Sequence, residues 1–375
     1  MKVGWEVKPF EDCIEKVTYT TKIQRKDFLG VGKFPVVSQE EALINGYWDD
    51  ERDVFSAKAP IVIFGDHTKV LKYIDFDFVL GADGVKLLPP KGFLVPKFFY
   101  YQLQTTQLDS LGYARHYKLL KELQIKFPNK AEQQRIVAIL DQAFTAIATA
   151  RAHAEQNLQN ARAVFDSHLQ AVFSQRGDGW VETTIGATIK FIDYRGKTPT
   201  KTESGIRLIT AKNIKMGYIQ ETPQEFIATD NYTTWMTRGI PKKGDVLFTT
   251  EAPLANVAQL DTNEKVAFAQ RVIIMQPDVK RLDSTFLKYL LLSPPVQKRI
   301  REKGTGATVQ GIKASLLKQI EISFPKQLNQ QQQIISTLDT LREQTQALES
   351  LYQCKIAALD ELKQSLLHQA FSGAL

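Results

Sequence analysis

The sequence predicts an α+β protein: two globular mixed α/β domains, separated by two long helices that form an antiparallel coiled coil with pseudo-two-fold symmetry. Three observations predict this fold. A phrase occurs twice, as FPNKAEQQRIVAILD (127–141) and FPKQLNQQQQIISTLD (324–339). Each copy runs into a long stretch with apolar residues at heptad spacing. The segment before each copy contains several short strand-like runs, and 375 residues exceed what one core usually holds.

The repeated phrase divides the chain into four segments. They are a first mixed domain (1–126), a central helical region (127–179), a second mixed domain (180–323) and a C-terminal helical region (324–375). An offset of 198 aligns residues 133–174 with 331–372 without a gap. This period is far longer than that of solenoid repeats, so the chain holds two copies of one module.

Both long helices carry start signals. Asn129 with Glu132, and Asn329 with Gln332, resemble capping boxes that follow a proline. Each helix is about 44 residues, or roughly 66 Å at 1.5 Å per residue. At four equivalent seam positions the first helix has Ala where the second has Leu or Tyr. Small side chains on one helix can interdigitate with large side chains on the other, so we expect the two helices to pack on each other. Two unrelated amphipathic helices, each covering its own domain, are the alternative.

Short apolar runs bounded by Gly, Pro and Asp indicate strands in both mixed domains. They are PIVIFG (60–65), FDFVLG (76–81), GDVLFTT (244–250) and QRVIIMQP (270–277). KFFYYQLQ (97–104) and STFLKYLLL (284–292) indicate short helices ahead of each copy of the repeated phrase.

Cysteine usage and hydropathy indicate a cytoplasmic protein. Only Cys13 and Cys354 are present, without metal-ligand spacing, so we expect neither a disulfide nor a zinc site. The N-terminus, MKVGWEVKPFEDC, lacks the apolar stretch of a signal peptide. No apolar run approaches the ~18 residues of a membrane helix.

The positive charge is concentrated in one segment. The net charge is +7, and residues 180–323 account for all of it, with 21 Lys and Arg against 14 Asp and Glu. A basic domain is typical of a nucleic-acid partner. A basic but unspecialised surface remains the alternative.

Three motifs suggest cofactor or catalytic sites, but each lacks its required context. DFLGVG (27–32) resembles an adenosylmethionine loop, yet Pro35 follows where a helix should open. SPPV (293–296) lacks the aromatic residue that an adenine methyltransferase uses to stack a flipped base. GKT (196–198) lacks the upstream glycine of a P-loop. We therefore predict no catalytic, cofactor-binding or metal-binding residues.

Polar and basic loops remain as candidate nucleic-acid contacts. Lys, Arg and Thr suit phosphates, whereas Arg, Asn and Gln suit base edges. In the second domain the candidates are Tyr194, Arg195, Lys197, Thr198, Lys201, Lys212, Asn213, Thr305, Thr308 and Gln310. Solvated turns use the same residue types, which is the alternative for each loop.

The whole pattern resembles the specificity (S) subunit of type I restriction-modification systems. The resemblance is carried by LLKELQIKFPNKAEQQRIVAILD (119–141) and LLKQIEISFPKQLNQQQQIISTLD (316–339), with RGKTPT (195–200) and LITAKNI (208–214). IFGDHT (63–68), followed by a GADG turn (81–84), adds to it. One departure is that the family's Glu-Gln pair is kept as Glu132-Gln133 but becomes Gln330-Gln331 in the second copy.

The resemblance implies that each mixed domain is a target recognition domain for one half of a split double-stranded DNA site. Asp66, His67 and Thr68 then join the candidate DNA contacts. The helices would set the half-site separation. Each repeat would dock one modification (M) subunit, which carries adenosylmethionine and methylates adenine at N6. The candidate docking residues are Glu132, Gln133, Gln330 and Gln331.

In this reading restriction (R) subunits complete the assembly, and the chain itself is non-catalytic and holds no cofactor. Two alternatives stay open at this point. One is a DNA methyltransferase or nuclease that reads DNA alone, and the other is a coiled-coil scaffold without a nucleic-acid role.

Overall fold

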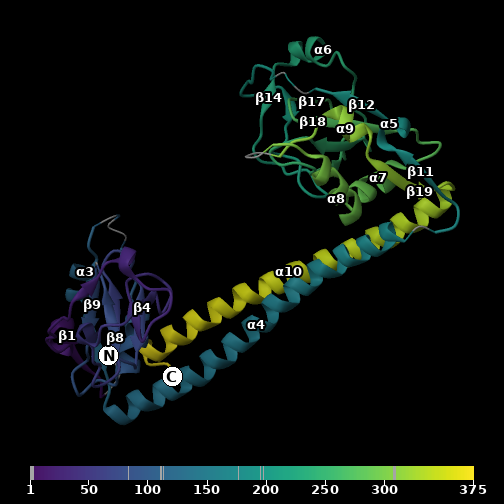
Figure 1. Ribbon diagram of the computed structural model, residues 1–375. Helices are drawn as coiled ribbons and strands as arrows, with labels where there is room; N and C mark the ends of the chain where they lie inside the picture. The colour runs from purple at the N-terminus through teal and green to yellow at the C-terminus, as the bar shows by residue number, and fades with distance from the viewer. Residues whose placement is uncertain are drawn as a thin grey trace. The chain divides into compact units, whose positions relative to one another are not determined.

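Two 45-residue helices, α4 (Lys130–Ser174) and α10 (Leu328–Ser372), each begin in one part of the protein and end in the other. The computed structural model describes residues 4–82, 84–109, 112, 114–175, 177–194, 196, 198–306 and 310–375. The chain forms two units, Met1–Glu155 with Gln353–Leu375, and Gln156–Tyr352. We call them unit 1 and unit 2. Each holds one mixed α/β domain with portions of α4 and α10 (Figure 1), which confirms the predicted α+β class.

The domain of unit 1 is built from short strands and helices that precede α4. Its strands are β1 (Glu6–Pro9), β2 (Lys22–Ile23), β3 (Phe34–Val37), β4 (Gly46–Trp48), β5 (Val54–Phe55), β6 (Ile61–Gly65), β7 (Leu71–Ile74), β8 (Phe78–Gly81), β9 (Val85–Leu88) and β10 (Gln124–Phe127). Its helices are α1 (Phe10–Cys13), α2 (Pro96–Gln104) and α3 (Tyr117–Lys121), with 3-10 turns η1 (Arg25–Asp27) and η2 (Glu51–Asp53).

The domain of unit 2 follows the same plan between α4 and α10. Its strands are β11 (Trp180–Thr184), β12 (Ile189–Asp193), β13 (Ile206–Ile209), β14 (Phe226–Ile227), β15 (Val246–Thr249), β16 (Val257–Gln259), β17 (Val266–Phe268), β18 (Val272–Pro277) and β19 (Glu321–Pro325). Its helices are α5 (Ile185–Thr188), α6 (Tyr232–Trp235), α7 (Ser284–Leu292), α8 (Pro294–Lys303) and α9 (Ala314–Lys318), with the 3-10 turn η3 (Thr229–Asn231).

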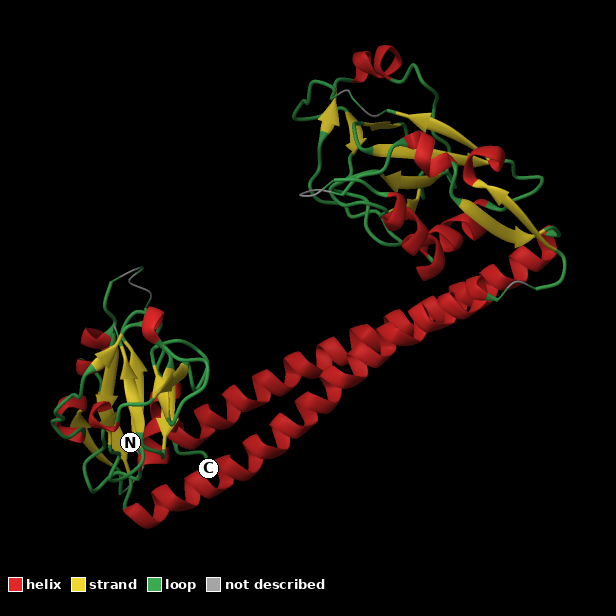
Figure 2. Cartoon of the chain, in the orientation of Figure 1, coloured by secondary structure: helices red, strands yellow, loops and turns green. Residues whose placement is uncertain are grey.

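The two domains repeat one strand topology in their central strands, and strands are drawn in yellow in Figure 2. In unit 1, β6 pairs with β7 and β9, while β3 is antiparallel to β4 and parallel to β8. In unit 2, β15 pairs with β16 and β18, while β13 is antiparallel to β14 and parallel to β17. The terminal strands also correspond, because β1 pairs with β10 and β11 pairs with β19. The duplication seen in the helices therefore extends through both domains.

The central strand of each domain is buried on both faces. In β6, Val62 and Phe64 enter one apolar cluster, whereas Ile61 and Ile63 enter another. This alternation follows the two-residue period of a strand. In unit 2, β15 divides its side chains between two clusters in the same way. A strand covered on both faces reads as a continuous apolar run, which is why IVIF and VLF were recognisable in the sequence.

The long helices run antiparallel within each unit. In unit 1, Arg151 of α4 forms an ion pair with Asp360 of α10, and the Lys363 ammonium lies 5.3 Å from the ring centre of Phe144. In unit 2, the Arg162 Nε atom lies 2.9 Å from a carboxylate oxygen of Glu349. Residue numbers rise along one helix as they fall along the other, so the predicted antiparallel packing is confirmed.

The predicted heptad seam is wrong at several positions. The heptad spacing of apolar residues predicts that Val164, Leu348 and Leu362 lie in the seam between the helices, but these residues are exposed. The buried positions of α4 instead continue through Leu169 and Phe173. A straight helix has 3.6 residues per turn, so over the roughly twelve turns of each 45-residue helix its apolar face drifts away from a strict heptad repeat. The apolar faces of α4 and α10 pack against the domains as well as against the other long helix.

One glutamine that the repeated phrase has in both copies, Gln133 or Gln331, attaches a long helix to its domain. The Gln133 side chain is fully buried. Its Oε1 accepts a hydrogen bond from the Val95 amide (2.7 Å), and its Nε2 donates to the carbonyls of Phe93 (3.0 Å) and Pro128 (2.8 Å). One side chain thus ties the start of α4 to the segment before α2.

Gln331 makes the equivalent joint in unit 2. It is also fully buried, accepts from the Asp283 amide (2.8 Å) and donates to the carbonyls of Arg281 (2.8 Å) and Pro325 (2.7 Å). The prediction that Gln133 and Gln331 bind a partner subunit is therefore wrong for these side chains. Their polar atoms are enclosed within the chain and already hydrogen-bonded.

A tyrosine-aspartate pair reinforces each joint. The Tyr101 hydroxyl of α2 donates to Asp141 of α4 at 2.5 Å, and Tyr289 of α7 donates to Asp339 of α10. Burial, followed by the carboxylate contact, raises the pKa of both tyrosines far above its ordinary value. Both hydroxyls therefore remain protonated donors at neutral pH.

The helix starts match the prediction in the first copy only. Asn129 caps α4, because its side chain accepts from the Glu132 amide at 3.0 Å. Helix α10 begins at Leu328, so Asn329 lies inside the helix and accepts from the neighbouring Gln330 amide instead. The predicted capping box at Asn329 and Gln332 is wrong. A cap at Asn329 would start the helix at Gln330, whereas α10 starts two residues earlier.

We expect Gln133→Ala to lower the free energy of unfolding by about 1–3 kcal/mol, because it leaves a buried amide and two carbonyls without partners. Gln134→Ala is the matched control, since Gln134 is exposed in the same helical turn. Urea denaturation of both variants measures the difference. Equal stability of the two variants would show that the buried joint contributes little.

Candidate nucleic-acid interface

Loops that are far apart in the sequence gather at one end of the unit 2 domain. Strands β12, β13 and β15 end there and β18 begins there, because Asp193 pairs with Ile273 and Thr249 with Val272. Parallel pairing of Ile209 with Phe268 brings the segment after β13 to the same end. We call this set of loops the unit 2 loop end.

The segment after α8 joins the same loops. Gly311 bridges to Glu251, and the backbones of Thr305 and Gly311 exchange two hydrogen bonds of 2.8 and 2.9 Å. The Gln270 amide also donates to the Thr198 hydroxyl. The predicted contacts Thr198, Lys212 and Thr305, which come from three separate segments, therefore belong to one surface.

Two predicted lysines lie on this surface beside a shared carboxylate. The Nζ atoms of Lys201 and Lys212 lie 2.7 and 3.9 Å from Oε1 of Glu225. The Lys212 side chain remains 69% exposed, so it can reach an incoming phosphate. Thr198, Thr305 and Gln310 are exposed as well. Arg195, Lys197 and Thr308, also predicted as contacts, lie outside the described residues.

Tyr194 and Asn213 shape the loops rather than face solvent. The Tyr194 hydroxyl donates to the Gly239 carbonyl and accepts from the Arg238 amide, both at 2.9 Å. The side chain of Asn213 accepts from the Thr210 amide (3.1 Å) and donates to the Pro223 carbonyl (2.9 Å). Both residues are buried. Their prediction as direct DNA contacts is therefore wrong, because their polar atoms are used internally.

Unit 1 has an equivalent loop end. Gly65 at the end of β6 pairs with Val85 at the start of β9, and β3 and β8 end at the same edge. The Thr68 hydroxyl donates to the Gln39 carbonyl (2.6 Å), and the His67 amide donates to the Gln39 side chain (3.1 Å). His67 and Thr68 are exposed on this surface, as a contact role requires.

Asp66 has a structural place in the same turn. Its side chain is 1% exposed, accepts from the Tyr117 amide at 2.7 Å and lies 3.7 Å from the Lys86 ammonium. The His116 ring also contacts the Asp66 carbonyl at 3.0 Å. The prediction of Asp66 as a DNA contact is wrong, because this carboxylate holds the α3 segment against the turn.

Several exposed polar residues at the two loop ends were missed by sequence reasoning. In unit 1, Arg25 and Lys26 follow β2, whose parallel pairing with β8 brings them to the loop end. In unit 2, Gln270 and Arg271 form the turn between β17 and β18. A two-residue strand such as β2 leaves no periodic signal. In the sequence, only the two polar residues that begin QRVIIMQP mark the turn before β18.

A buried lysine organises the segment that follows β3. The Lys72 side chain is 4% exposed. Its ammonium donates to the Ala42 carbonyl (2.5 Å) and to the Asn45 side chain (3.0 Å). Burial lowers the pKa of Lys72 from its ordinary 10.5 to about 8. Residues 38–45 are thereby fastened to β7 at the loop end.

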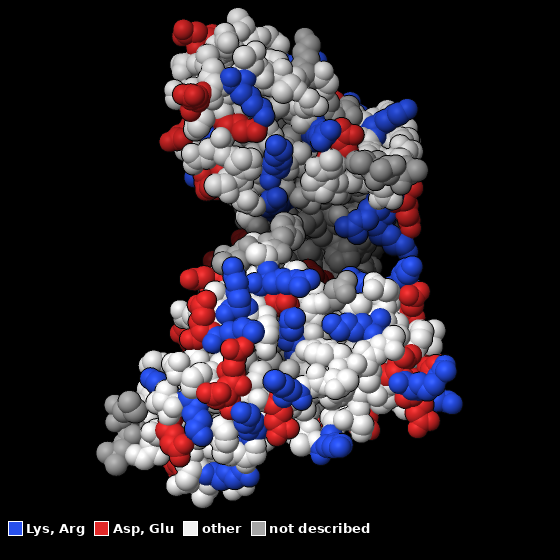
Figure 3. All heavy atoms as spheres, turned by 90° about the vertical axis from the view of Figure 1, so that its left-hand side faces the viewer, with Lys and Arg blue, Asp and Glu red and all other residues white. Residues whose placement is uncertain are grey.

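One face of the protein carries charges of both signs. On the face shown in Figure 3, Lys and Arg are interspersed with Asp and Glu. Any phosphate contact on this face would therefore depend on particular loops rather than on a uniform positive field.

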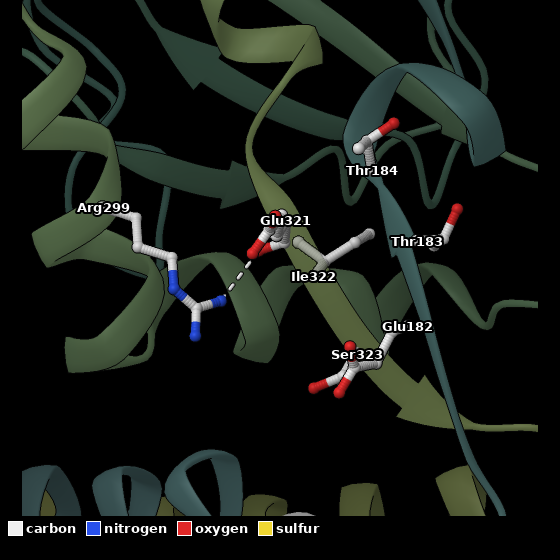
Figure 4. A pocket seen from close by; sticks show the side chains of 7 residues that line it. All are labelled: Glu182, Thr183, Thr184, Arg299, Glu321, Ile322 and Ser323. Carbon is white, nitrogen blue, oxygen red and sulfur yellow. Dashed lines mark hydrogen bonds between the residues drawn. The ribbon is translucent and has the colours of Figure 1, made fainter.

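A cavity of about 230 Å³ lies beside the β11–β19 pair of unit 2 (Figure 4). None of the residues that line it belongs to the turns of the unit 2 loop end. Arg299 of α8 donates to the Glu321 carbonyl there at 2.8 Å. Its lining includes the carboxylates of Glu182 and Glu321 and a single guanidinium. Such a lining disfavours phosphate and offers no nucleophile paired with a base.

Within the described ranges, no three His, Cys, Asp or Glu side chains are grouped so as to hold a metal ion. Nor does any helix in that part of the chain combine the length and apolar character needed to cross a membrane.

At the first turns of the long helices, Glu132 pairs with Arg135 at 2.7 Å and Gln330 is exposed. These two predicted docking residues therefore lie where a partner can reach them.

Comparison with known proteins gives one consistent family. The family model described as the type I restriction modification DNA specificity domain matches residues 2–159 and 179–354. The specificity subunit of the type I restriction enzyme EcoR124I/EcoR124II from Escherichia coli is 25% identical over 357 residues, which cover 87% of this chain and 84% of that protein.

Two solved structures share the fold over essentially the whole chain. One describes complex assembly and conformational transition of the type I R-M system, with a TM-score of 0.76, 18% identity and coverage of 100% of this chain and 99% of the other. The second is the HsdS subunit from Thermoanaerobacter tengcongensis, with a TM-score of 0.57, 18% identity and coverage of 100% and 98%.

The lowered pKa of Lys72 predicts a pH-dependent stability. Between about pH 8 and pH 10.5 the unfolded chain holds this proton and the folded chain does not, so stability rises with pH across that window. The slope from one group is at most ~1.4 kcal/mol per pH unit. We expect Lys72→Met to remove this rise, whereas Lys58→Met, at an exposed site, should keep it. Urea denaturation at several pH values tests this, and identical slopes for both variants would refute it.

Proposed function

The chain belongs to the type I restriction-modification DNA specificity family, and from this premise we propose that it reads a bipartite double-stranded DNA site, each unit reading one half. Members of this family are specificity subunits, so the chain is a non-catalytic, sequence-recognising subunit. The proposed target recognition domains are residues 1–126 and 180–323. Residues 127–179 and 324–375 are the proposed spacer regions. Because cellular DNA is the target, we also propose a cytoplasmic location.

One observation carries the proposal: the same strand topology is present twice, and each copy ends in a cluster of polar loops. The loop end of unit 1 presents His67 and Thr68, whereas that of unit 2 presents Lys201 and Lys212. To read two half-sites of different sequence, the two units need the same scaffold with different loop residues. Phosphate contacts from the lysines would fix register, and amide or guanidinium groups would read base edges.

We propose that the long helices set the spacer between the half-sites. Each helix has 45 residues, which at 1.5 Å per residue is about 68 Å. Readers of one DNA face are separated by about one helical turn, roughly 34–36 Å. Helices of this length can cover that separation with both ends held in the domains by Gln133 and Gln331.

We propose that modification subunits supply the chemistry and that restriction subunits add to the assembly. The E. coli relative is a specificity subunit of a restriction enzyme, and the structure with the higher TM-score concerns assembly of a type I R-M complex. Glu132 and Gln330 occupy equivalent places in the two copies, so we propose that they contact two modification subunits in equivalent ways. Adenosylmethionine and adenine N6 methylation then belong to those partners.

The proposal predicts an interrupted methylation motif. DNA from cells that express this chain with its modification subunit should carry N6-methyladenine in one split sequence with a fixed spacer. Sequencing that detects modified adenine measures this. A continuous motif, or methylation that does not depend on the chain, would contradict the proposal.

A paired helix insertion tests the spacer role. Seven residues inserted after Glu155 and seven after Tyr352 keep the heptad register in both helices. The insertion adds about 10 Å at 1.5 Å per residue, or roughly 3 base pairs at 3.4 Å each. We expect the spacer to lengthen accordingly while both half-site sequences stay the same. An unchanged spacer, or a changed half-site sequence, would argue against a measuring role for the helices.

A further inference from the structure

A cavity of about 350 Å³ opens at the unit 2 loop end, among turns from four separate segments. Its lining includes Glu251, Gln270 and Arg271. These are the side-chain types that recognise base edges in the major groove: Arg contacts guanine O6 and N7, Gln contacts adenine N6 and N7, and Glu accepts from cytosine N4. None of the three was identified from the sequence.

Arg271 adopts a backbone conformation that favours other residues. Its φ is +75°, in the left-handed region where Gly or Asn is easily accommodated and a long side chain is unfavourable. The surrounding backbone fixes this conformation, because the Arg271 carbonyl accepts from the Thr250 amide at 2.9 Å. The Thr250 carbonyl accepts in turn from the Ile312 amide at 2.9 Å. A turn that served only to connect β17 and β18 would gain stability from glycine at this position.

The side chain of Arg271 is oriented by a carboxylate rather than buried. Its Nε lies 3.1 Å from Oε1 of Glu251, and the two side chains are 46% and 47% exposed. A contact through Nε is compatible with both terminal Nη groups donating to a guanine. Gln270, next in the same turn, contacts Thr198, one of the predicted DNA contacts. The pair thus presents a guanidinium and an amide side by side at the solvent edge.

We propose that Arg271 is a base-contacting residue of unit 2 that reads a guanine in its half-site, with Glu251 as its positioning residue and Gln270 as a second base contact. This inference rests on the proposed function, and it assigns the sequence preference of one half-site to one turn. The turn between β15 and β16, which carries Glu251 in unit 2, corresponds to the turn between β6 and β7 in unit 1. The unit 1 turn carries His67 instead. The same place in the scaffold therefore carries different chemistry in the two units, as two different half-sites need.

The competing explanation is that the Glu251–Arg271 ion pair only stabilises the loops. Exposed ion pairs contribute little to stability, and the strained φ of Arg271 opposes folding. A lysine would preserve the ion pair without the bidentate geometry that reads guanine. A charge-exchanged pair, Glu251→Arg with Arg271→Glu, would likewise restore a purely structural interaction. Neither change would restore base reading.

The test uses the whole chain expressed in cells with its modification subunit, with methylated motifs mapped by sequencing. Arg271→Lys and the exchanged pair should each lose discrimination at one G·C position of one half-site, by roughly 5- to 150-fold. The other half-site and the spacer should stay as in the parent chain. Lys280→Ala is the control, because Lys280 is an exposed cation beyond the opposite end of β18.

Retention of the parent motif by Arg271→Lys or by the exchanged pair would overturn the assignment of Arg271, while the parent chain's split motif would still stand. Absence of a split motif in the parent chain would instead overturn the proposed function. Thermal unfolding of each purified variant separates lost reading from lost folding. Lost discrimination with unchanged unfolding supports the proposal, and lost methylation with a lowered unfolding temperature in both variants counts against a reading role.

Discussion

The fully buried glutamine at the start of each long helix, Gln133 or Gln331, is the constraint on which the rest of the structure depends. Gln133 and Gln331 each bond three backbone groups from two elements, the segment before a short helix and the strand end before a long helix. A buried amide with both its donor and acceptor satisfied fixes orientation more strictly than apolar packing, because any rotation leaves polar groups unpaired. The loop ends are carried by the domains, so the direction in which they face follows from this joint. The Tyr101–Asp141 and Tyr289–Asp339 pairs hold the next turn of each helix in place.

The polar residues of the loop ends form two classes with different roles. Asp66, Tyr194 and Asn213 are buried and bond the backbone, so they determine loop shape. His67, Lys212 and Arg271 are exposed on those shaped loops and remain accessible to DNA. Buried Lys72 belongs to the first class despite its charge, because its ammonium fastens residues 38–45. A specificity protein needs both classes, since base reading requires donors and acceptors held in fixed positions. The loops can then change their exposed residues without disturbing the scaffold.

Much of the fold could be predicted from the sequence, because its signals are local. The β6 and β15 runs, the short α2 and α7 helices and the duplicated phrase all follow from apolar periodicity and end signals. The sequence could not show whether a polar residue faces inward. Gln133 and Gln134 are adjacent and identical, yet one is fully buried and the other exposed, because helix rotation against the domain decides between them. The heptad seam failed at Val164 for a related reason, since helical drift accumulates over long distances. Arg271 was missed because a left-handed turn residue is recognisable only from backbone geometry.

The most direct test of the account is a hybrid chain in which residues 180–323 are replaced by the corresponding segment of a relative with a different recognition sequence. The hybrid is expressed with the modification subunit, and N6-methyladenine is mapped across the genome. Two equivalent joints and two independent readers predict that one half of the motif changes to that of the relative, while the other half and the spacer length stay the same. A motif changed in both halves, or unchanged in both, would contradict the claim that each unit reads one half of the site.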